Sequence, residues 1–376
     1  MEIFSENVIG LDIGSSSVKA VKLKKTNEGY EITGAEIVSV LSDSIENVSP
    51  DLRHSLYVDA VKKILRAKNM TGKKIVTSVL SAENSTIIRY VGLPYMTEDE
   101  LKNQMPHQLE QYVPIAQDQI AYDYKVVTEY AEDSQKKMLV LIVAVKNDSM
   151  NQHMSILKDA GFSPQAIDVD PLALCNAYTL NAEEETSELR LNTVALINIG
   201  AKSTILQIVE KNVPRFTKDI SLAGNNFTKD IMREFQLDFP QAEELKKQQA
   251  RILVESEETL LDTVRDANDE KVIRINDAMK SSLNKLFQEI RRGFEYYENN
   301  NKKQAGSVQK ILLSGGSSRI QNIDKFLAEK LSIPVEINYP FKNVNIDSKN
   351  FDLDNLRLNA VQFNIALGLA IRKVGV

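Results

Sequence analysis

The chain has 376 residues, a formal net charge of -6 and 43% hydrophobic residues. This length allows two or three packed domains, and the acidic balance disfavours a generic nucleic-acid-binding protein. The single cysteine, Cys175, excludes an intramolecular disulfide and is interpreted as a buried thiol in a reducing compartment. No window reaches the roughly 20 apolar residues that a bilayer span needs, so membrane association is expected only through a partner.

The N-terminal part of the chain predicts a meander followed by a helix and a strand. Three strands are expected within residues 7–38, joined by a serine-rich loop and by a short polar turn. Residues 55–70 space apolar side chains every three or four positions, as an amphipathic helix does. Residues 73–80 return to a strand pattern, which completes the predicted order of strand, strand, strand, helix, strand.

Residues 84–162 are interpreted as an inserted α/β module. Its predicted order is strand, helix, two strands and a helix, over residues 86–94, 97–113, 121–130, 137–146 and 149–161. Thr97 and Glu100 have the spacing of a capping box at a helix start. Pro106 lacks a backbone donor and predicts a kink or two short helices.

The next segments predict a connection and a helical region. Residues 165–178 are interpreted as a strand running into a helix, and the acidic residues 181–191 as a linker. Residues 239–301 are rich in charge and strongly periodic, which predicts a helical subdomain closing over a ligand. His54, His107 and His153 lack the spacing of metal ligands, and solvated or capping roles are expected for them.

One stretch of sequence occurs twice. VIGLDIGSSSVKAVK, from Val8, and VALINIGAKSTILQI, from Val194, match in every class of position. This similarity predicts two copies of one supersecondary plan. A single glycine hairpin is more often a solvent-exposed turn, but two facing turns expose enough backbone NH groups to surround a phosphate chain. Neither G-x-x-x-x-G-K-[ST] nor G-x-G-x-x-G occurs, which disfavours a P-loop or a simple dinucleotide-binding domain.

A third glycine loop follows an apolar strand in KILLSGGSSRI, at Gly315 and Gly316. Backbone without side chains allows close approach of a flat ring, so an adenine or ribose is expected against it. Alone, the same pattern would be an ordinary turn between a strand and a helix.

These motifs resemble those of the superfamily that contains actin, Hsp70 and the sugar kinases. The resemblance implies an α/β fold of actin-like (ribonuclease H-like) duplicated domains around a nucleotide cleft. It also implies an inserted 1C-type α/β subdomain, a helical 2B-type subdomain, and ATP and Mg2+ as cofactors. The implied connecting helices are VDPLALCNAY and the C-terminal NAVQFNIALGLAIRK.

The resemblance also implies which residues form the site. The implied nucleotide-binding residues are Gly14, Ser15, Ser16, Ser17, Lys19, Asn198, Gly200, Ala201, Lys202, Ser203, Gly224, Asn225, Glu243, Lys246, Gly315, Gly316 and Ser317. Asp12 is implied as a catalytic residue that, with Asn198, holds Mg2+ through water. Asp170 is the candidate for positioning the attacking water. Lys19 either reaches the phosphates or lies on a solvated strand face, and Glu243 with Lys246 could equally be an exposed salt pair.

Within that superfamily the sequence resembles the PilM family of type IV pilus assembly proteins. LEQYVPIAQDQIAYDYKVV, NVPRFTKDI and GNNFTKDI carry this resemblance, which covers nearly the whole chain. It implies a cytoplasmic protein, peripheral to the inner membrane, that binds the cytoplasmic tail of a PilN-type inner-membrane protein. The implied groove lies beside the 1C module, at Leu109, Tyr112, Val113 and Pro114. Other pilus components and self-association are further expectations, and direct membrane insertion is not expected.

The resemblance further implies a division into subdomains. It assigns 1–83, 165–190 and 355–376 to 1A, 84–164 to 1C, 191–236 and 305–354 to 2A, and 237–304 to 2B.

One departure from the superfamily concerns turnover. Asn198 stands where most members have Asp, and an amide lacks the charge that holds a divalent cation. Ala223 also replaces the first of two glycines common in relatives. The expectation is nucleotide binding with slow or absent hydrolysis, so enzymatic activity stays open.

Two alternatives are retained, a small-molecule kinase of the same fold and an FtsA-like division protein. A kinase usually has a catalytic Asp within a substrate loop, and only Asp170 is available. An FtsA-like protein would be expected to continue into an amphipathic helix after AIRKVGV.

Overall fold

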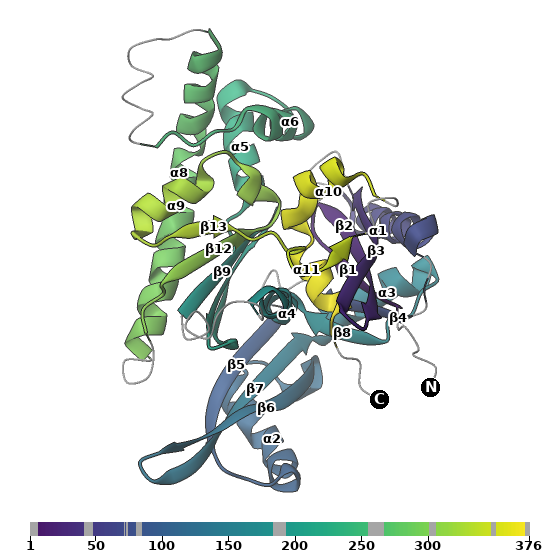
Figure 1. Ribbon diagram of the computed structural model, residues 1–376, viewed down its shortest axis with the longest axis vertical. Coiled ribbons are helices and arrows are strands. Elements are labelled where there is room, and N and C mark those ends of the chain that lie inside the picture. The colour runs from purple at the N-terminus through teal and green to yellow at the C-terminus, as the bar shows by residue number, and fades with distance from the viewer. Residues whose placement is uncertain are drawn as a thin grey trace.

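A computed structural model gives the arrangement of the chain, and it describes residues 7–40, 48–70, 72, 74–79, 85–182, 193–254, 267–300, 306–346 and 351–372. Two main sheets lie in separate halves, and a third, smaller sheet projects from them (Figure 1). Most of the predicted linker over 181–191 lies outside the described residues. The same holds for the predicted boundaries at 83/84, 190/191 and 304/305.

The first sheet is built on the predicted meander. Its strands, in spatial order, are β14 (Asn345–Ile346), β3 (Gly29–Ser39), β2 (Ser17–Thr26), β1 (Asn7–Ile13), β4 (Lys74–Val79) and β8 (Ala166–Val169). β1, β2 and β3 are antiparallel neighbours, and β4 adds parallel to β1. β14 pairs with β3, so residues 345–346 lie with the first sheet although the sequence analysis assigned them to 2A.

The second sheet repeats this plan. Its order is β11 (Val213–Ile220), β10 (Thr204–Glu210), β9 (Thr193–Ile199), β12 (Lys310–Ser314) and β13 (Val335–Ile337). The three strands β9, β10 and β11 are antiparallel, and β12 lies parallel beside β9 as β4 lies beside β1. The internal repeat read from the sequence is therefore confirmed in three dimensions.

Helices cover both faces of the first sheet. α1 (Pro50–Leu65) and α3 (Asn147–Ala160) pack on one face, where Ile156 and Leu157 of α3 join a core with Ile9 and Leu11. The sequence analysis assigned α3 to the inserted module, and the structure corrects this. The apolar face of α3 is buried against α1 and the first sheet because Ile156, Leu157 and Ala160 all point there.

Two helices lie between the main sheets. α4 (Asp170–Ala182) and α11 (Asn364–Ala370) pack against each other and against residues of both halves. A Cβ atom at Gly368 would lie only 1.7 Å from the carbonyl oxygen of Ala173, so this crossing needs a glycine.

The C-terminal helix is shorter than the sequence predicted. The segment is divided into α10 (Leu353–Asn359), a 3-10 turn (Ala360–Gln362) and α11. The carbonyl of Val361 accepts from the backbone NH of Gly315 and from the Asn364 side chain. A carbonyl satisfied in this way is not free to continue a helical ladder, which explains the break.

The predicted helical region packs on the second sheet. It contains α6 (Phe239–Gln249) and α8 (Ala267–Asn300), and α5 (Gly224–Phe235), which precedes it in the chain, packs with them at the top of Figure 1. α9 (Ile323–Leu331) lies nearby. Phe227, Met279 and Leu286 from these helices share a core with Leu206 of β10. α8 is the long helix that joins this end to the second sheet.

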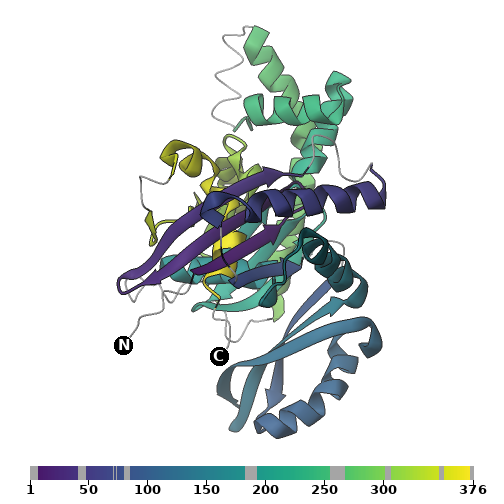
Figure 2. The ribbon, with the colours of Figure 1, turned by 90° about the vertical axis from the view of Figure 1, so that its right-hand side faces the viewer.

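The third sheet contains β5 (Thr86–Pro94), β7 (Gln135–Lys146) and β6 (Ile120–Glu132), in that order, with α2 (Glu98–Tyr112) packed on one face. It projects away from the helical end (Figure 2). The predicted capping box at Thr97 is present. Pro106 does not divide α2 into two helices, because Leu101 and Met105 on one side of it and Leu109 on the other are buried on the same face. A register shift interrupts β6 between Val126 and Thr128.

Among the residues that the structure describes, no helix has both the length and the apolar character needed to cross a bilayer.

Candidate functional site

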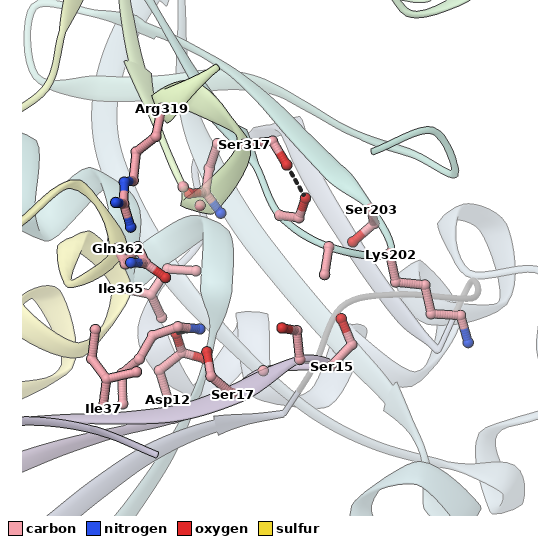
Figure 3. Close-up of a pocket in the computed structure, with 18 of the residues that line it drawn as sticks. Asp12, Ser15, Ser17, Ile37, Lys202, Ser203, Ser317, Arg319, Gln362 and Ile365 are labelled. Carbon is pink, nitrogen blue, oxygen red and sulfur yellow. Dashed lines mark hydrogen bonds and ion pairs between the residues drawn. The ribbon is translucent and has the colours of Figure 1, made fainter. Parts of the chain in front are cut away.

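The cavity lined by the predicted motifs lies between the two halves and has a volume of about 380 Å3. Figure 3 shows Ser15 and Ser17 on one wall and Lys202 and Ser203 on the wall opposite. Of the residues implied by the resemblance, those that line it are Asp12, Gly14, Ser15, Ser16, Ser17, Lys19, Asp170, Asn198, Gly200, Ala201, Lys202, Ser203, Glu243, Lys246, Gly315, Gly316 and Ser317.

The two glycine turns have the same backbone geometry. The NH of Gly14 donates to the carbonyl of Ser17 at 3.1 Å, and the NH of Gly200 donates to the carbonyl of Ser203 at 3.0 Å. A Cβ at Gly200 would lie 2.9 Å from the carbonyl oxygen of Ser203. Both turns therefore need a residue without a side chain, and both direct backbone toward one cavity.

The first hairpin carries a buried ion pair. Asp12 and Lys19 are direct partners across β1 and β2, and their side chains lie on the same face of the hairpin. The Nζ of Lys19 is 3.1 Å from Oδ2 of Asp12, with the side chains 14% and 4% exposed. Lys19 is thus not on a solvated strand face, which was one of its two interpretations.

The second hairpin carries a neutral amide at the equivalent position. Oδ1 of Asn198 accepts a hydrogen bond from the hydroxyl of Ser314 at 3.2 Å. Gly315 follows Ser314 with a φ of 88°, and a Cβ there would lie 2.7 Å from that same amide oxygen. The third glycine loop is therefore fixed against the second hairpin.

Asp170 begins α4 at the floor of the cavity and is buried. Burial, and next the charge of Asp12, raise the pKa of its carboxyl to about 8, although a hydrogen bond donated by Ser78 acts in the opposite direction. A carboxyl with this pKa is mostly protonated at neutral pH. It can then donate a hydrogen bond but is a weak general base.

Glu243 and Lys246 of α6 are a partly buried pair rather than an exposed one. Nζ of Lys246 lies 2.6 Å from the Glu243 carboxylate and donates to the Gly224 carbonyl and the Thr228 hydroxyl. Burial lowers the pKa of Lys246, opposed by the Glu243 charge. The pair therefore attaches α6 to α5 and faces the cavity with its remaining surface.

Gly224 and Asn225 stand behind the second hairpin and do not line the cavity. The NH of Gly224 donates to the Gly200 carbonyl at 3.1 Å, and the NH of Asn225 donates to the Ala201 carbonyl at 2.7 Å. Their role in the structure is to hold the second turn in place. Direct contact of Gly224 and Asn225 with a nucleotide stays a prediction.

The sequence analysis missed one wall of the cavity. Arg319 donates to Oδ1 of Asn359 at 3.1 Å, and Gln362 donates to the same oxygen at 3.0 Å. The unpredicted lining residues are Ile37, Ser39, Ile205, Lys247, Arg319, Ile320, Asn359, Gln362 and Ile365. Lys247, Ile205, Arg319 and Ile320 lie within three residues of predicted ones, so their positions in the sequence were an available signal. The others come from segments in which no site residue was predicted.

The lining has an excess of positive charge. Its described cations are Lys19, Lys202, Lys246, Lys247 and Arg319, and its described acids are Asp12, Asp170 and Glu243. Five cations against three acids suit a polyanion, because unlike charges attract strongly where water is partly excluded.

The residues implied for a partner groove are not arranged as a groove. Leu109 and Val113 are 1% and 2% exposed in the core beneath the third sheet, and Tyr112 is half-buried. Pro114 is exposed and lines a cavity of about 400 Å3 between β5 and β11, with Thr86, Ile115 and Asp219 among its neighbours. Leu109 and Val113, which the resemblance placed in a groove, instead belong to the buried core between α2 and the third sheet.

A different groove, of about 250 Å3, lies on the other side of the third sheet. It runs between β6 and β8, each of which is the last strand of its sheet. Leu141, Val143 and Leu172 give it an apolar floor. Nη1 of Arg372 lies 3.0 Å from the Asp168 carboxylate at one wall.

Two of the three histidines have side-chain partners within the fold, and His107 is exposed. Nε2 of His153 is 3.1 Å from the Thr77 hydroxyl, and burial lowers its pKa to about 4, so it is buried rather than solvated as expected. Nε2 of His54 is 2.7 Å from the Asp159 carboxylate. The part of the chain that the structure describes contains no cluster of three His, Cys, Asp or Glu side chains suited to a metal.

Two sheets built on one plan, α4 and α11 between them, and a glycine hairpin from each half facing one cavity define the actin-like class of proteins. Within this class, the sequence model described as type IV pilus assembly protein PilM matches residues 10–374. The chain therefore belongs to the PilM family of type IV pilus assembly proteins, as its sequence motifs implied.

Solved structures agree with this fold. A structure titled PilM-PilN type IV pilus biogenesis complex superimposes with a TM-score of 0.79 and 23% identity, over 98% of this chain and 99% of that chain. The ethanolamine utilization protein EutJ of Carboxydothermus hydrogenoformans gives a TM-score of 0.52 at 10% identity, over 97% of this chain and 89% of that one.

Two cell division proteins are also similar in sequence to the chain. FtsA of Buchnera aphidicola subsp. Baizongia pistaciae is 24% identical over 368 residues, which cover 89% of this chain and 84% of that protein. FtsA of Bacillus subtilis is 24% identical over 266 residues, 65% of this chain and 58% of its own length. The family match favours pilus assembly over division.

Proposed function

We propose that the protein is an adaptor of type IV pilus assembly. It binds the cytoplasmic N-terminal tail of a PilN-like inner-membrane protein, which holds it at the cytoplasmic face of that membrane. It also binds a nucleotide of the ATP type between its two halves. The observation that carries the adaptor function is the groove between the free edges of β6 and β8.

The groove suits an extended peptide. An edge strand has backbone NH and carbonyl groups on its open side, which can pair with an added strand. Half-buried Leu141 and Val143 on β7 provide apolar contacts for alternate side chains of such a peptide. Asp123 and Lys125 on β6 supply charges that can fix its register.

A titration of the purified chain with the N-terminal peptide of a PilN-like protein tests the adaptor function. Leu141→Glu places a charge on the apolar floor, and we expect it to weaken peptide binding by about 10–100-fold, since burying an unpaired charge is costly. Leu358→Glu is the matched control, because Leu358 is 61% exposed on α10, and it is expected to leave the affinity unchanged. Pro114→Glu tests the groove implied by the sequence.

If Leu141→Glu binds the peptide with unchanged affinity and Pro114→Glu binds it more weakly, the tail binds in the cavity between β5 and β11 instead. No binding of the peptide by the unaltered chain would reject the adaptor function itself.

The nucleotide part of the proposal is supported by the two facing hairpins and by the positive charge of the cavity. Backbone NH groups and lysines from both halves suit a polyphosphate. Asp12 and Asn198, the positions that the resemblance implies for Mg2+, line this cavity, as does Asp170. Saturable binding of ATP by calorimetry is the expected result, and its absence with and without Mg2+ would reject this part.

The subdomain division is proposed with two changes. The 1A subdomain takes α3 and residues 345–346 in addition to its predicted segments, since α3 packs on α1 and β14 pairs with β3. The 1C module then contains β5, α2, β6 and β7. Deletion of residues 86–146 should remove tail binding and leave ATP binding.

A further inference from the structure

The register of the first hairpin fixes a lysine beside its carboxylate. Asp12 and Lys19 are directly opposite each other on β1 and β2, where cross-strand side chains are nearest neighbours. Their ion pair has an N–O distance of 3.1 Å and lines the cleft. The fold itself therefore places a positive charge, the Lys19 ammonium, next to the Asp12 carboxylate.

Separating this pair is unfavourable. Both side chains are largely buried, at 4% and 14% exposure, so removing one partner leaves a charge that water solvates poorly. A hydrated divalent cation that binds Asp12 must either displace the Lys19 ammonium or lie close to a like charge. Both choices reduce the affinity of Asp12 for a metal.

The second hairpin does not provide a carboxylate that could make up for the reduced metal affinity of Asp12. Asn198 offers an uncharged oxygen that already accepts from the Ser314 hydroxyl at 3.2 Å. Mg2+ in nucleotide sites depends on one or two carboxylates together with the phosphates. Here one carboxylate is neutralised and the other position is an amide, so the donor set fits Mg2+ poorly.

The same residues fit a polyphosphate without a metal. Lys19 lies beside the first turn and Lys202 belongs to the second, while Arg319 and the α6 lysines extend the positive lining. An ammonium that already faces the cavity can neutralise phosphate charge and donate to phosphate oxygens.

We propose that Lys19 takes the place of the divalent cation at the first hairpin, so that nucleoside triphosphates bind this chain without requiring Mg2+. This inference rests on the nucleotide-binding function proposed above, and concerns how that site neutralises its ligand.

The test measures the dissociation constant of ATP for the full chain by calorimetry, in Mg2+ and in EDTA. We expect the two values for the unaltered chain to agree within about tenfold. Lys19→Met removes the charged hydrogen bond, and its affinity in EDTA should fall by about 10–100-fold. With Asp12 then unpaired, Mg2+ should recover part of that loss.

Two further variants keep the test decisive. Lys19→Arg retains the charge and should retain binding in EDTA, which separates a loss of charge from a failure to fold. Lys202→Met removes a lysine from the opposite wall and should lower the affinity equally in both buffers. Binding of ATP by the unaltered chain only when Mg2+ is present would overturn the inference while leaving nucleotide binding intact. No binding in either buffer would instead reject the nucleotide-binding function.

Discussion

The two glycine hairpins share one backbone and differ in their chemistry. Each closes with a glycine NH on a serine carbonyl three residues later, at 3.1 and 3.0 Å. The first has a carboxylate paired with a lysine, and the second has an amide that accepts from a serine. Duplication has thus kept the geometry that directs backbone donors into the cavity, while the side chains that would manage a metal have diverged.

The difference in side chains between the two hairpins affects nucleotide hydrolysis more than nucleotide binding. Backbone NH groups are sufficient to hold phosphate, and both hairpins retain them. Hydrolysis needs a cation and a positioned water, for which the second hairpin lacks a carboxylate and Asp170 is mostly protonated. The comparison predicts a protein in which nucleotide binding is robust and hydrolysis is slow.

The largest effect is expected from breaking the shared geometry. Gly200→Val would force the turn apart, because a Cβ there would lie 2.9 Å from the Ser203 carbonyl oxygen. Overpacking of this kind costs about 1–3 kcal/mol, and the ATP affinity should fall by about 10–100-fold. Gly14→Val should act similarly, since its Cβ would lie 2.7 Å from Nζ of Lys19. Calorimetric titration measures both.

Gly29→Ala is a suitable control, because nothing lies within 4 Å of a Cβ at that turn, although its φ of 128° adds backbone strain. It should lower stability without changing the affinity for ATP. Wild-type affinity in Gly200→Val would show that the second turn does not contact the nucleotide.

A smaller effect is expected from making the two hairpins alike. Asn198→Asp introduces a buried carboxylate beside Ser314, and we expect a loss of about 1–3 kcal/mol in the free energy of unfolding. Mg2+ should recover part of this loss, because the site then has a second carboxylate. Thermal unfolding in EDTA and in Mg2+ measures both effects.

Asn151→Asp, at an exposed position of α3, controls for the added negative charge. Its melting temperature should equal that of the unaltered chain in EDTA and in Mg2+. A melting temperature for Asn198→Asp that is lowered and insensitive to Mg2+ would mean that this position does not face a metal.

The third prediction concerns the buried carboxyl of Asp170, whose effect appears in how stability depends on pH. The folded pKa of Asp170, about 8, exceeds its ordinary value of 3.8. Its contribution to stability is therefore complete below pH 3.8 and is lost as the pH rises to about 8. Asp170→Asn removes this loss, so the variant should gain stability relative to the unaltered chain as the pH rises from about 4 to 9.

Unfolding midpoints in denaturant across this pH range measure the difference. Asp59→Asn, at an exposed position of α1, should show no such trend. A constant difference between Asp170→Asn and the unaltered chain would indicate that Asp170 is ionised throughout.

Much of the site could be predicted because its signals are local. The repeat around Asp12 and Asn198 lies in short contiguous segments, and turn geometry follows directly from glycine at fixed positions. The third glycine loop could likewise be predicted, because Gly315 and Gly316 directly follow an apolar strand in the sequence. By contrast, Asn359 and Gln362 reach the cavity from a segment that the sequence assigned to one long helix.

The errors concern packing partners. Apolar spacing indicates that a helix face is buried but not which neighbour buries it, and α3 was therefore assigned to the wrong unit. The resemblance placed Leu109 and Val113 in a partner groove, whereas they are buried in the core that α2 shares with the third sheet. Both questions depend on long-range packing that a single sequence does not specify.

The register shift in β6 has a consequence for aggregation. A free strand edge that accepts a peptide can also accept another copy of the same protein, which is how many folded proteins associate edge to edge. The shift between Val126 and Thr128 ends the regular edge shortly beyond the groove. Beyond it, Glu129 and Glu132 are engaged by lysines of β7. Only the short stretch beside the groove is regular enough to recruit a strand, which limits unwanted polymerisation where copies are crowded together.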